Sequence, residues 1–182
     1  NGDGEVDFAV YRPASAQWWI LYRGTTGTLG SVMRPWGEQG DIPVASDYDG
    51  DGKQDIAVWR PSTGEWFIVF ADGSVRVLEF GAKGDIPIPG DYLGYGFSQP
   101  ALYREELGLW LIYTKAGVVL EQWGLAGDTP LRMDRNRDGR QDLAVFRESL
   151  GMWFVRTLDS VAVEVFAEQF GLPGDLPFGD VR

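Results

Sequence analysis

Four copies of one short motif divide this chain of 182 residues into similar units. The tetrapeptide Gly-Asp-x-Pro begins at Gly40, Gly84, Gly127 and Gly174, a spacing of about 45 residues. A unit of this length cannot bury its own hydrophobic face, so neighbouring units must pack against one another. The repetition therefore predicts a repeat architecture rather than several independent folds.

Three further markers recur with the same period. An arginine ends one apolar stretch of each unit, a tryptophan opens the next, and an aromatic residue precedes a glycine further on. The markers are Arg12, Arg60, Arg104 and Arg147; Trp18, Trp66, Trp110 and Trp153; and Trp36-Gly37, Phe80-Gly81, Trp123-Gly124 and Phe170-Gly171. We predict a single repeat domain, 1–182, with approximate units 1–46, 47–90, 91–133 and 134–182.

The second unit shows which elements each copy forms. Residues 55–60 and 66–70 are apolar and rich in strand formers, Asp72-Gly73 is typical of a tight hairpin turn, and residues 75–80 alternate apolar with polar. The stretch GDIPIPGD contains two prolines, so it can form only a short edge strand or a connector. Short strands with recurring aromatics predict an all-β propeller. Its four repeats form a four-bladed ring, or part of a larger or intermolecularly closed propeller.

The composition excludes several classes of function. Histidine and cysteine are both absent, which excludes disulfides and nucleophiles activated by histidine. The net charge of −11 repels nucleic-acid phosphates and anionic lipids. No apolar run reaches the roughly 18 residues that a membrane-spanning helix needs. We therefore expect neither a nucleic-acid partner nor membrane insertion.

An acidic loop precedes the first long strand of the second unit. In DYDGDGKQD, the oxygen-bearing positions are Asp47, Asp49, Asp51, the backbone carbonyl of Lys53, and Asp55. Ca²⁺ takes about six to eight oxygen ligands, and an EF-hand wraps the ion with this alternation around a sharp glycine turn. Here the loop leads into a strand rather than a helix. The pattern predicts a Ca²⁺ site.

A second complete copy of the loop is DRNRDGRQD. Its oxygen-bearing positions are Asp134, Asn136, Asp138, the carbonyl of Arg140, and Asp142. The ligand positions are retained while the spacers between them vary, which favours a cation over a plain Asp/Gly turn. The two complete copies predict two Ca²⁺ ions, and Mg²⁺ is less suitable because it resists cages made only of protein.

The other two copies are incomplete. The third retains Asp91 but has Leu93, Tyr95 and Gln99 at ligand positions, so we predict that it has lost its ion. The fourth is split between the chain ends, with Asn1, Asp3, the carbonyl of Glu5 and Asp7 at one end and Asp180 at the other. A third Ca²⁺ site there is an open hypothesis. The complementary ends fit a closed ring or a homo-oligomer or polymer joined head to tail.

The repeated arginines and tryptophans each have two interpretations. The arginines could bind anions, but Asp41, Asp85, Asp128 and Asp175 recur with the same period, which favours bidentate Arg–Asp pairs. The tryptophans could stack on sugars, but a side chain that opens the same strand in every unit usually packs in the core. Trp19 and Tyr95 lie outside this pattern.

An enzyme is the third interpretation. Two carboxylates about 5–9.5 Å apart could serve a glycosidase. However, the recurring acids already have a cation or an arginine as a counter-charge, and no group of residues departs from the repeat to form a distinct constellation. We therefore expect no enzymatic activity.

The stretches FGAKGDIPIPGDY and DGDGKQDIAVWRP resemble FG-GAP/VCBS repeats, which build the calcium-bearing propellers of integrin α-chain heads and of many bacterial secreted proteins. The resemblance extends over all four units. It implies structural Ca²⁺, an extracellular or cell-surface location, and a role in binding or adhesion to an unidentified protein or glycan. A filament subunit and a lectin-like propeller remain alternatives. The resemblance also implies that the acidic loop enters an inner strand and that the aromatic-Gly pair ends an outer strand.

Overall fold

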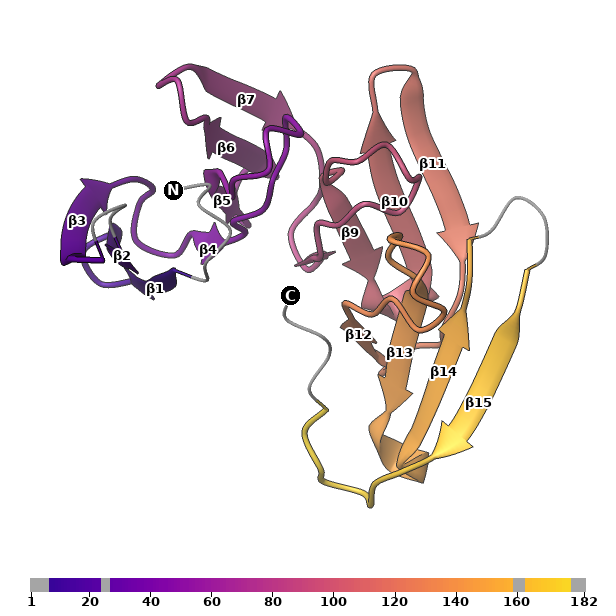
Figure 1. Ribbon diagram of the computed structural model, residues 1–182. Coiled ribbons are helices and arrows are strands. Elements are labelled where there is room, and N and C mark those ends of the chain that lie inside the picture. The colour runs from indigo at the N-terminus through magenta and orange to yellow at the C-terminus, as the bar shows by residue number, and fades with distance from the viewer. Residues whose placement is uncertain (1–6, 24–26, 159–162, 178–182) are drawn as a thin grey trace. The chain divides into compact units, whose positions relative to one another are not determined.

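The computed structural model describes residues 7–23, 27–158 and 163–177, and it contains four antiparallel sheets (Figure 1). These sheets are the blades of a β-propeller, which confirms the predicted fold class. The chain divides into two compact units, Asn1–Lys83 and Gly84–Arg182, and each unit contains two sheets. From here on, the first and second unit are these two parts of the chain and not the four sequence repeats. Among the described residues, no helix is both long and apolar enough to cross a bilayer.

The first unit contains a three-stranded sheet and a four-stranded sheet, with the strands of each in sequence order. The three-stranded sheet consists of β1 (Phe8–Arg12), β2 (Gln17–Arg23) and β3 (Leu29–Pro35). The four-stranded sheet consists of β4 (Ile42–Pro43), β5 (Ile56–Arg60), β6 (Glu65–Val69) and β7 (Val75–Glu79).

The second unit contains two four-stranded sheets. One consists of β8 (Ile86–Pro87), β9 (Ala101–Arg104), β10 (Leu109–Thr114) and β11 (Gly117–Gln122), and the other of β12 (Thr129–Leu131), β13 (Leu143–Arg147), β14 (Met152–Arg156) and β15 (Val165–Gln169). Single-turn 3-10 helices, η1 (Glu105–Leu107) and η2 (Glu148–Leu150), connect the second and third strands of these sheets.

The prolines in the Gly-Asp-x-Pro stretch restrict its strand to two or three residues. In the second unit, Ile86–Pro87 pairs antiparallel with β9. This short strand therefore belongs to the same sheet as the residues that follow it, although the sequence units placed it at the end of the preceding repeat. As a result, each complete acidic loop connects the short edge strand of a sheet to the strand beside it.

The burial of each strand follows its place in the sheet. Ala57, Val58 and Trp59 of β5 are buried on both faces, as expected for a continuous apolar run inside a sheet. Val75 and Val77 of β7 are more than half exposed, because this strand forms the opposite edge and its residues alternate between two environments.

The repeated tryptophans lie in the core, as predicted. Trp66 and Trp110 are fully buried, Trp18 is almost so, and Trp153 is half-buried. Each indole Nε1 donates a hydrogen bond to the carbonyl of the aromatic residue that precedes the repeated glycine, at 2.8–3.2 Å. Two of the sequence markers are therefore the two partners of a single contact, which ties the residue that follows the last strand of each sheet to the strand before it.

The bidentate Arg–Asp pair is formed in the three four-stranded sheets. Two hydrogen bonds join Arg60 to Asp41 at 2.9 and 3.0 Å, Arg104 to Asp85 at 2.8 and 2.9 Å, and Arg147 to Asp128 at 2.7 and 2.8 Å. The three aspartates are buried. These contacts confirm the structural interpretation of the three arginines. In the described part of the chain Arg12 forms no such pair, and its guanidinium lies over the ring of Trp19.

Candidate metal centre

The first acidic loop brings three of its predicted ligands together. One oxygen each of Asp47, Asp49 and Asp55 lie within 4.8 Å of one another. Three negative charges in so small a space repel one another strongly. A cation that binds oxygens at about 2.3–2.6 Å would fit between them and remove this repulsion.

Asp55 is the most informative residue of this loop. It is 2 % exposed, and its Oδ2 accepts a hydrogen bond from the backbone N–H of Tyr48 at 2.9 Å. Its other oxygen, Oδ1, is buried and has no hydrogen-bond partner. A buried carboxylate oxygen without a donor is costly, and a cation bound at this oxygen would remove the cost.

The rest of the loop is held in place by its own backbone. The two carboxylate oxygens of Asp47 accept hydrogen bonds from Gly50 N–H at 2.6 Å and Gly52 N–H at 2.9 Å. Asp51 lies outside the group of three, because its oxygens bond to the backbone N–H of Lys53 at 2.8 Å and to the Lys53 ammonium at 3.3 Å. Glycine is required at position 52, where φ is +81°.

The second loop has the same backbone frame as the first. Asp142 is 1 % exposed, and its Oδ2 accepts from Arg135 N–H at 2.8 Å, as Asp55 does from Tyr48. Asp134 accepts from the N–H groups of Asp138 and Gly139, both at 3.1 Å. Asn136 stands where the first loop has Asp49, so this loop has two carboxylates, Asp134 and Asp142, at the positions that converge in the first loop.

Asn136 takes part in a contact within the loop. The side-chain amide of Asn136 donates to Asp138 Oδ2 at 3.0 Å, so that oxygen is already engaged inside the loop. The remaining predicted contributor, the carbonyl of Arg140, follows Gly139 in the same turn, and Arg140 N–H donates to Asp138 Oδ1 at 2.8 Å.

Of the predicted ligands of the split fourth loop, only Asp7 lies within the described residues. Asn1, Asp3, Glu5 and Asp180 lie outside the described residues. Asp7 is half-buried and contributes to the wall of a cavity in the first unit. The hypothesis of a third Ca²⁺ site remains a prediction.

The third loop is satisfied without any ion. Gln99 stands where the other loops have Asp55 and Asp142, and it is 2 % exposed. Its Oε1 accepts from Tyr92 N–H at 2.8 Å, and its Nε2 donates to the Phe97 carbonyl at 2.6 Å. The amide therefore supplies donors where the acidic loops have only acceptors.

Residues at the spacer positions, between the predicted ligands, also form contacts that the sequence did not predict. Tyr48 and Tyr92 occupy the second position of their loops, are buried, and donate their hydroxyl groups to the carbonyls of Val44 and Ile88. They anchor each loop to the short strand before it. The signal that could have identified them is the recurrence of tyrosine at one spacer position in two copies.

Burial and neighbouring charges shift the acidity of the closing residues in the same direction. Desolvation raises the pKa of Asp55 to about 6, and the carboxylates of Asp49, Asp47 and Asp51 add to the effect. Desolvation also raises the pKa of Asp142 to about 6, with further contributions from Asp138 and Asp134. Both groups resist ionisation in the folded protein unless a cation is present.

The shifts predict how the stability of the protein without a bound cation depends on pH. The unfolded chain titrates near pKa 3.8 and the folded loops near 6, so the folded state binds protons more tightly between these values. The free energy of unfolding should therefore rise as the pH falls from 7 to 5. Urea denaturation of decalcified protein at the two pH values measures this. A lower urea midpoint at pH 5 would contradict the assignment, and the double variant Asp55→Asn, Asp142→Asn should show a smaller pH effect.

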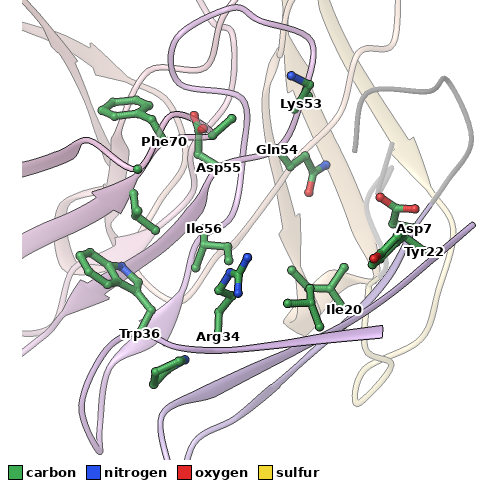
Figure 2. Close-up of a pocket in the computed structure, with 15 residues that line it drawn as sticks. Asp7, Ile20, Tyr22, Arg34, Trp36, Lys53, Gln54, Asp55, Ile56 and Phe70 are labelled. Carbon is green, nitrogen blue, oxygen red and sulfur yellow. The ribbon is translucent and has the colours of Figure 1, made fainter. Parts of the chain in front are cut away.

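A cavity of about 620 Å³ lies beside the first loop, between the two sheets of the first unit (Figure 2). Asp55 and Phe70 lie at one end of the labelled residues, and Asp7 and Tyr22 at the other. Arg34 and Lys53 also line the cavity. Asp55, which closes the first acidic loop, therefore also contributes to the cavity wall.

The corresponding space in the second unit is bridged by side chains. Arg156 of β14 forms an ion pair with Glu121 of β11 and donates to the Gln122 carbonyl at 3.2 Å. In the first unit the residues at the positions of Arg156 and Glu121 are Val69 and Arg34, which cannot form this pair.

The comparisons with known proteins agree with this architecture. Residues 1–58 match the family model of the FG-GAP-like repeat. This match confirms, for that segment, the resemblance stated from the sequence. It includes the first acidic loop and most of β5, and therefore the best-formed candidate metal centre. No curated protein matches the chain significantly.

A solved structure shares the fold. The crystal structure of selenomethionine-substituted virginiamycin B lyase from Staphylococcus aureus aligns with a TM-score of 0.55 and 13 % sequence identity. The alignment covers 90 % of this chain but only 55 % of that one. At this identity the similarity concerns the fold alone.

Proposed function

We propose that the chain is a non-enzymatic, calcium-stabilised propeller module that serves extracellular binding, adhesion or structure. The observation that carries this proposal is the buried, unpartnered Oδ1 of Asp55, in a loop whose Asp47, Asp49 and Asp55 oxygens lie within 4.8 Å of one another. The ion would neutralise these charges and hold the loop against the start of β5. The match of residues 1–58 to the FG-GAP-like repeat supports the same assignment.

Two loops have the residues to hold Ca²⁺. The first would use Asp47, Asp49, Asp51, the Lys53 carbonyl and Asp55, and the second Asp134, Asn136, Asp138, the Arg140 carbonyl and Asp142. All the donors are oxygens, which suits Ca²⁺ and is a poor ligand set for softer metals. Asp51 and Asn136 would exchange their present hydrogen bonds within the loop for the ion.

The expected strength of binding favours a structural ion over a switch. Extracellular Ca²⁺ modules have Kd values of roughly 10⁻⁴–10⁻³ M. At about 1 mM Ca²⁺, linkage then stabilises the folded state by roughly 0.4–1.4 kcal/mol for each site. That is enough to order a loop, but affinity of this order would leave the sites empty at cytosolic Ca²⁺ levels. This affinity range is taken from extracellular modules, so the proposed extracellular location rests on the similarity to FG-GAP-like repeats, and a submicromolar Kd would contradict it.

The test is a calcium titration of decalcified protein by calorimetry, with a variant for each loop. We expect two sites in the wild type, and loss of one site in Asp55→Asn and of the other in Asp142→Asn. Asp72→Asn is the matched control, because Asp72 is an exposed acid in a hairpin turn outside both loops. Absence of binding heat in the wild type up to several millimolar Ca²⁺, with an unchanged thermal midpoint, would refute the proposal.

Asp55→Asn should also change the calcium-free protein. The asparagine Oδ1 can accept from Tyr48 N–H, and its amide can donate to the neighbouring carboxylates, so the variant has no buried charge to desolvate. We expect it to be more stable than the wild type in chelator and insensitive to Ca²⁺ at this loop. A variant that is less stable than the wild type in chelator would show that Asp55 has a favourable partner other than a cation.

Exposed aromatic side chains favour glycans as one class of ligand. Trp19 is 40 % exposed and Tyr95 is 56 % exposed, and Tyr95 lies 5.7 Å from Phe97 between ring centroids. Aromatic faces of this kind can stack on sugar rings. Glycan-array binding that is lost in Trp19→Ala or Tyr95→Ala would assign a lectin role, whereas binding that survives both changes would exclude these two platforms.

A further inference from the structure

We propose that the side-chain amide of Gln99 replaces the cation in the third loop, and that Gln99→Glu would turn this loop into a cation site. The inference extends the proposed calcium function of the other two loops, on which its second half rests. It concerns Asp91 to Gln99, all of which the structure describes.

The geometry places the Gln99 nitrogen where an ion would bind. Nε2 donates to Asp91 Oδ1 at 3.3 Å and to the Phe97 carbonyl at 2.6 Å. These acceptors occupy the first and seventh positions of the loop. In the first loop the same positions are Asp47 and the Lys53 carbonyl, which are both predicted Ca²⁺ ligands. One N–H₂ group thus satisfies two of the oxygens that a cation would bind.

The oxygen of the Gln99 side chain makes the same kind of contact as one carboxylate oxygen of Asp55 and of Asp142. Its Oε1 accepts from Tyr92 N–H at 2.8 Å and Leu93 N–H at 3.2 Å. In the acidic loops, Asp55 Oδ2 accepts from Tyr48 N–H and Asp142 Oδ2 accepts from Arg135 N–H. The closing residues of the three loops therefore each have one oxygen that accepts from a backbone N–H. They differ in the second polar atom of the side chain, which is a hydrogen-bond donor only in Gln99.

The remaining positions of the third loop are consistent with a metal-free state. Leu93 and Tyr95 contribute no side-chain oxygen in the interior of the loop, and Asp91 accepts from the N–H groups of Tyr95 at 2.9 Å and Gly96 at 2.8 Å. Within the described residues, no buried polar side-chain atom of this loop lacks a partner, in contrast to Asp55 Oδ1. This loop therefore needs no ion to close.

The first test compares the three loops of the wild type by hydrogen exchange in Ca²⁺ and in chelator. Removing Ca²⁺ should accelerate exchange in residues 47–55 and 134–142 and leave residues 91–99 unchanged. Faster exchange in 91–99 on chelation would overturn the proposal. If none of the three loops responds, the calcium function fails, while the role of the amide is still decided by the variants below.

The second test uses Gln99→Glu, which preserves size and the Oε1 contact but replaces the donor with a second oxygen. That oxygen would face Asp91 Oδ1 and the Phe97 carbonyl, so in chelator we expect about tenfold faster exchange in residues 91–99 than in the wild type. Millimolar Ca²⁺ should reverse most of this loss. Gln99→Leu, which can neither donate nor ligate, is the control and should be impaired equally in both conditions.

Two outcomes of the second test would overturn the proposal. One is a Gln99→Glu protein that is as well protected as the wild type in chelator, because the amide donors would then be dispensable. The other is a Gln99→Glu protein that is impaired but shows no recovery in Ca²⁺, because the loop would then not be convertible into a cation site. Calorimetry of Gln99→Glu should show one more Ca²⁺ site than the wild type.

Discussion

Replacing Arg147 with methionine should lower the free energy of unfolding of the second unit by about 3–5 kcal/mol. The guanidinium forms two hydrogen bonds to Asp128 and lies 4.4 Å from the ring centroid of Phe154. The side chain of Asp128 is 1 % exposed, so the substitution leaves a buried carboxylate without its counter-charge. Most of the cost comes from that stranded charge rather than from the loss of the pair itself.

Chemical denaturation monitored by tryptophan fluorescence would measure this loss. Arg147→Lys retains the positive charge but not the planar fork, so it should fall between the wild type and Arg147→Met. Adding Asp128→Asn to Arg147→Met removes the buried charge and should restore part of the stability. An Arg147→Met protein that unfolds at the same denaturant concentration as the wild type would mean that Asp128 is solvated in solution.

Trp110→Ala should have an effect of similar size, a loss of about 3–5 kcal/mol. Trp110 is fully buried, its ring centroid lies 5.2 Å from that of Tyr103 and 5.9 Å from that of Tyr92, and its Nε1 donates to the Trp123 carbonyl at 2.9 Å. Removal of the indole leaves a cavity and an unpaired carbonyl at the point where the repeat is tied together.

Two variants separate the contributions to this effect. Trp110→Phe retains much of the volume but not the donor, so it should cost clearly less than the alanine variant. Trp19→Ala removes a tryptophan that is 40 % exposed, and it should lower the free energy of unfolding by less than about 1 kcal/mol. Thermal and urea denaturation of the three variants test this order. Equal losses for Trp110→Ala and Trp19→Ala would contradict the assignment of Trp110 to the core.

These magnitudes exceed the contribution to stability that we expect from each proposed ion. Loss of an Arg–Asp pair or of a buried tryptophan should lower the free energy of unfolding by about 3–5 kcal/mol. A Ca²⁺ site of millimolar affinity raises it by only roughly 0.4–1.4 kcal/mol through linkage. We therefore expect chelated protein to remain folded, with exchange increased locally at the two acidic loops. Cooperative unfolding of the whole chain on chelation would show that the ions contribute more than this estimate.

The sequence predicted the architecture well because periodic markers report periodic contacts. The arginines and the Gly-Asp aspartates were expected to pair, and three pairs are formed with two hydrogen bonds each. The tryptophans were expected in the core, but the acceptor of each indole N–H was not foreseen. That acceptor is a backbone carbonyl, and its position depends on strand register rather than on residue type.

The candidate site was less predictable than the fold. The pattern predicted the ligand residues of the first loop, but only the structure shows that Asp47, Asp49 and Asp55 converge while Asp51 bonds to Lys53. In the second loop, Asn136 stands in place of Asp49 and donates a hydrogen bond to Asp138, a contact that the pattern did not predict. A pattern specifies which atoms are available, whereas competing hydrogen bonds decide which of them meet.

The sequence by itself determined the repeat, the all-β class, the paired arginines and aspartates, and the loops that could hold a cation, because each depends on residue type and spacing along the chain. The tertiary structure alone decided which carboxylate is buried without a donor and that the Gln99 amide lies between Asp91 and the Phe97 carbonyl. It also decided that a cavity lies between the sheets of the first unit. These features depend on distances of a few ångströms between segments that the folded sheets bring together.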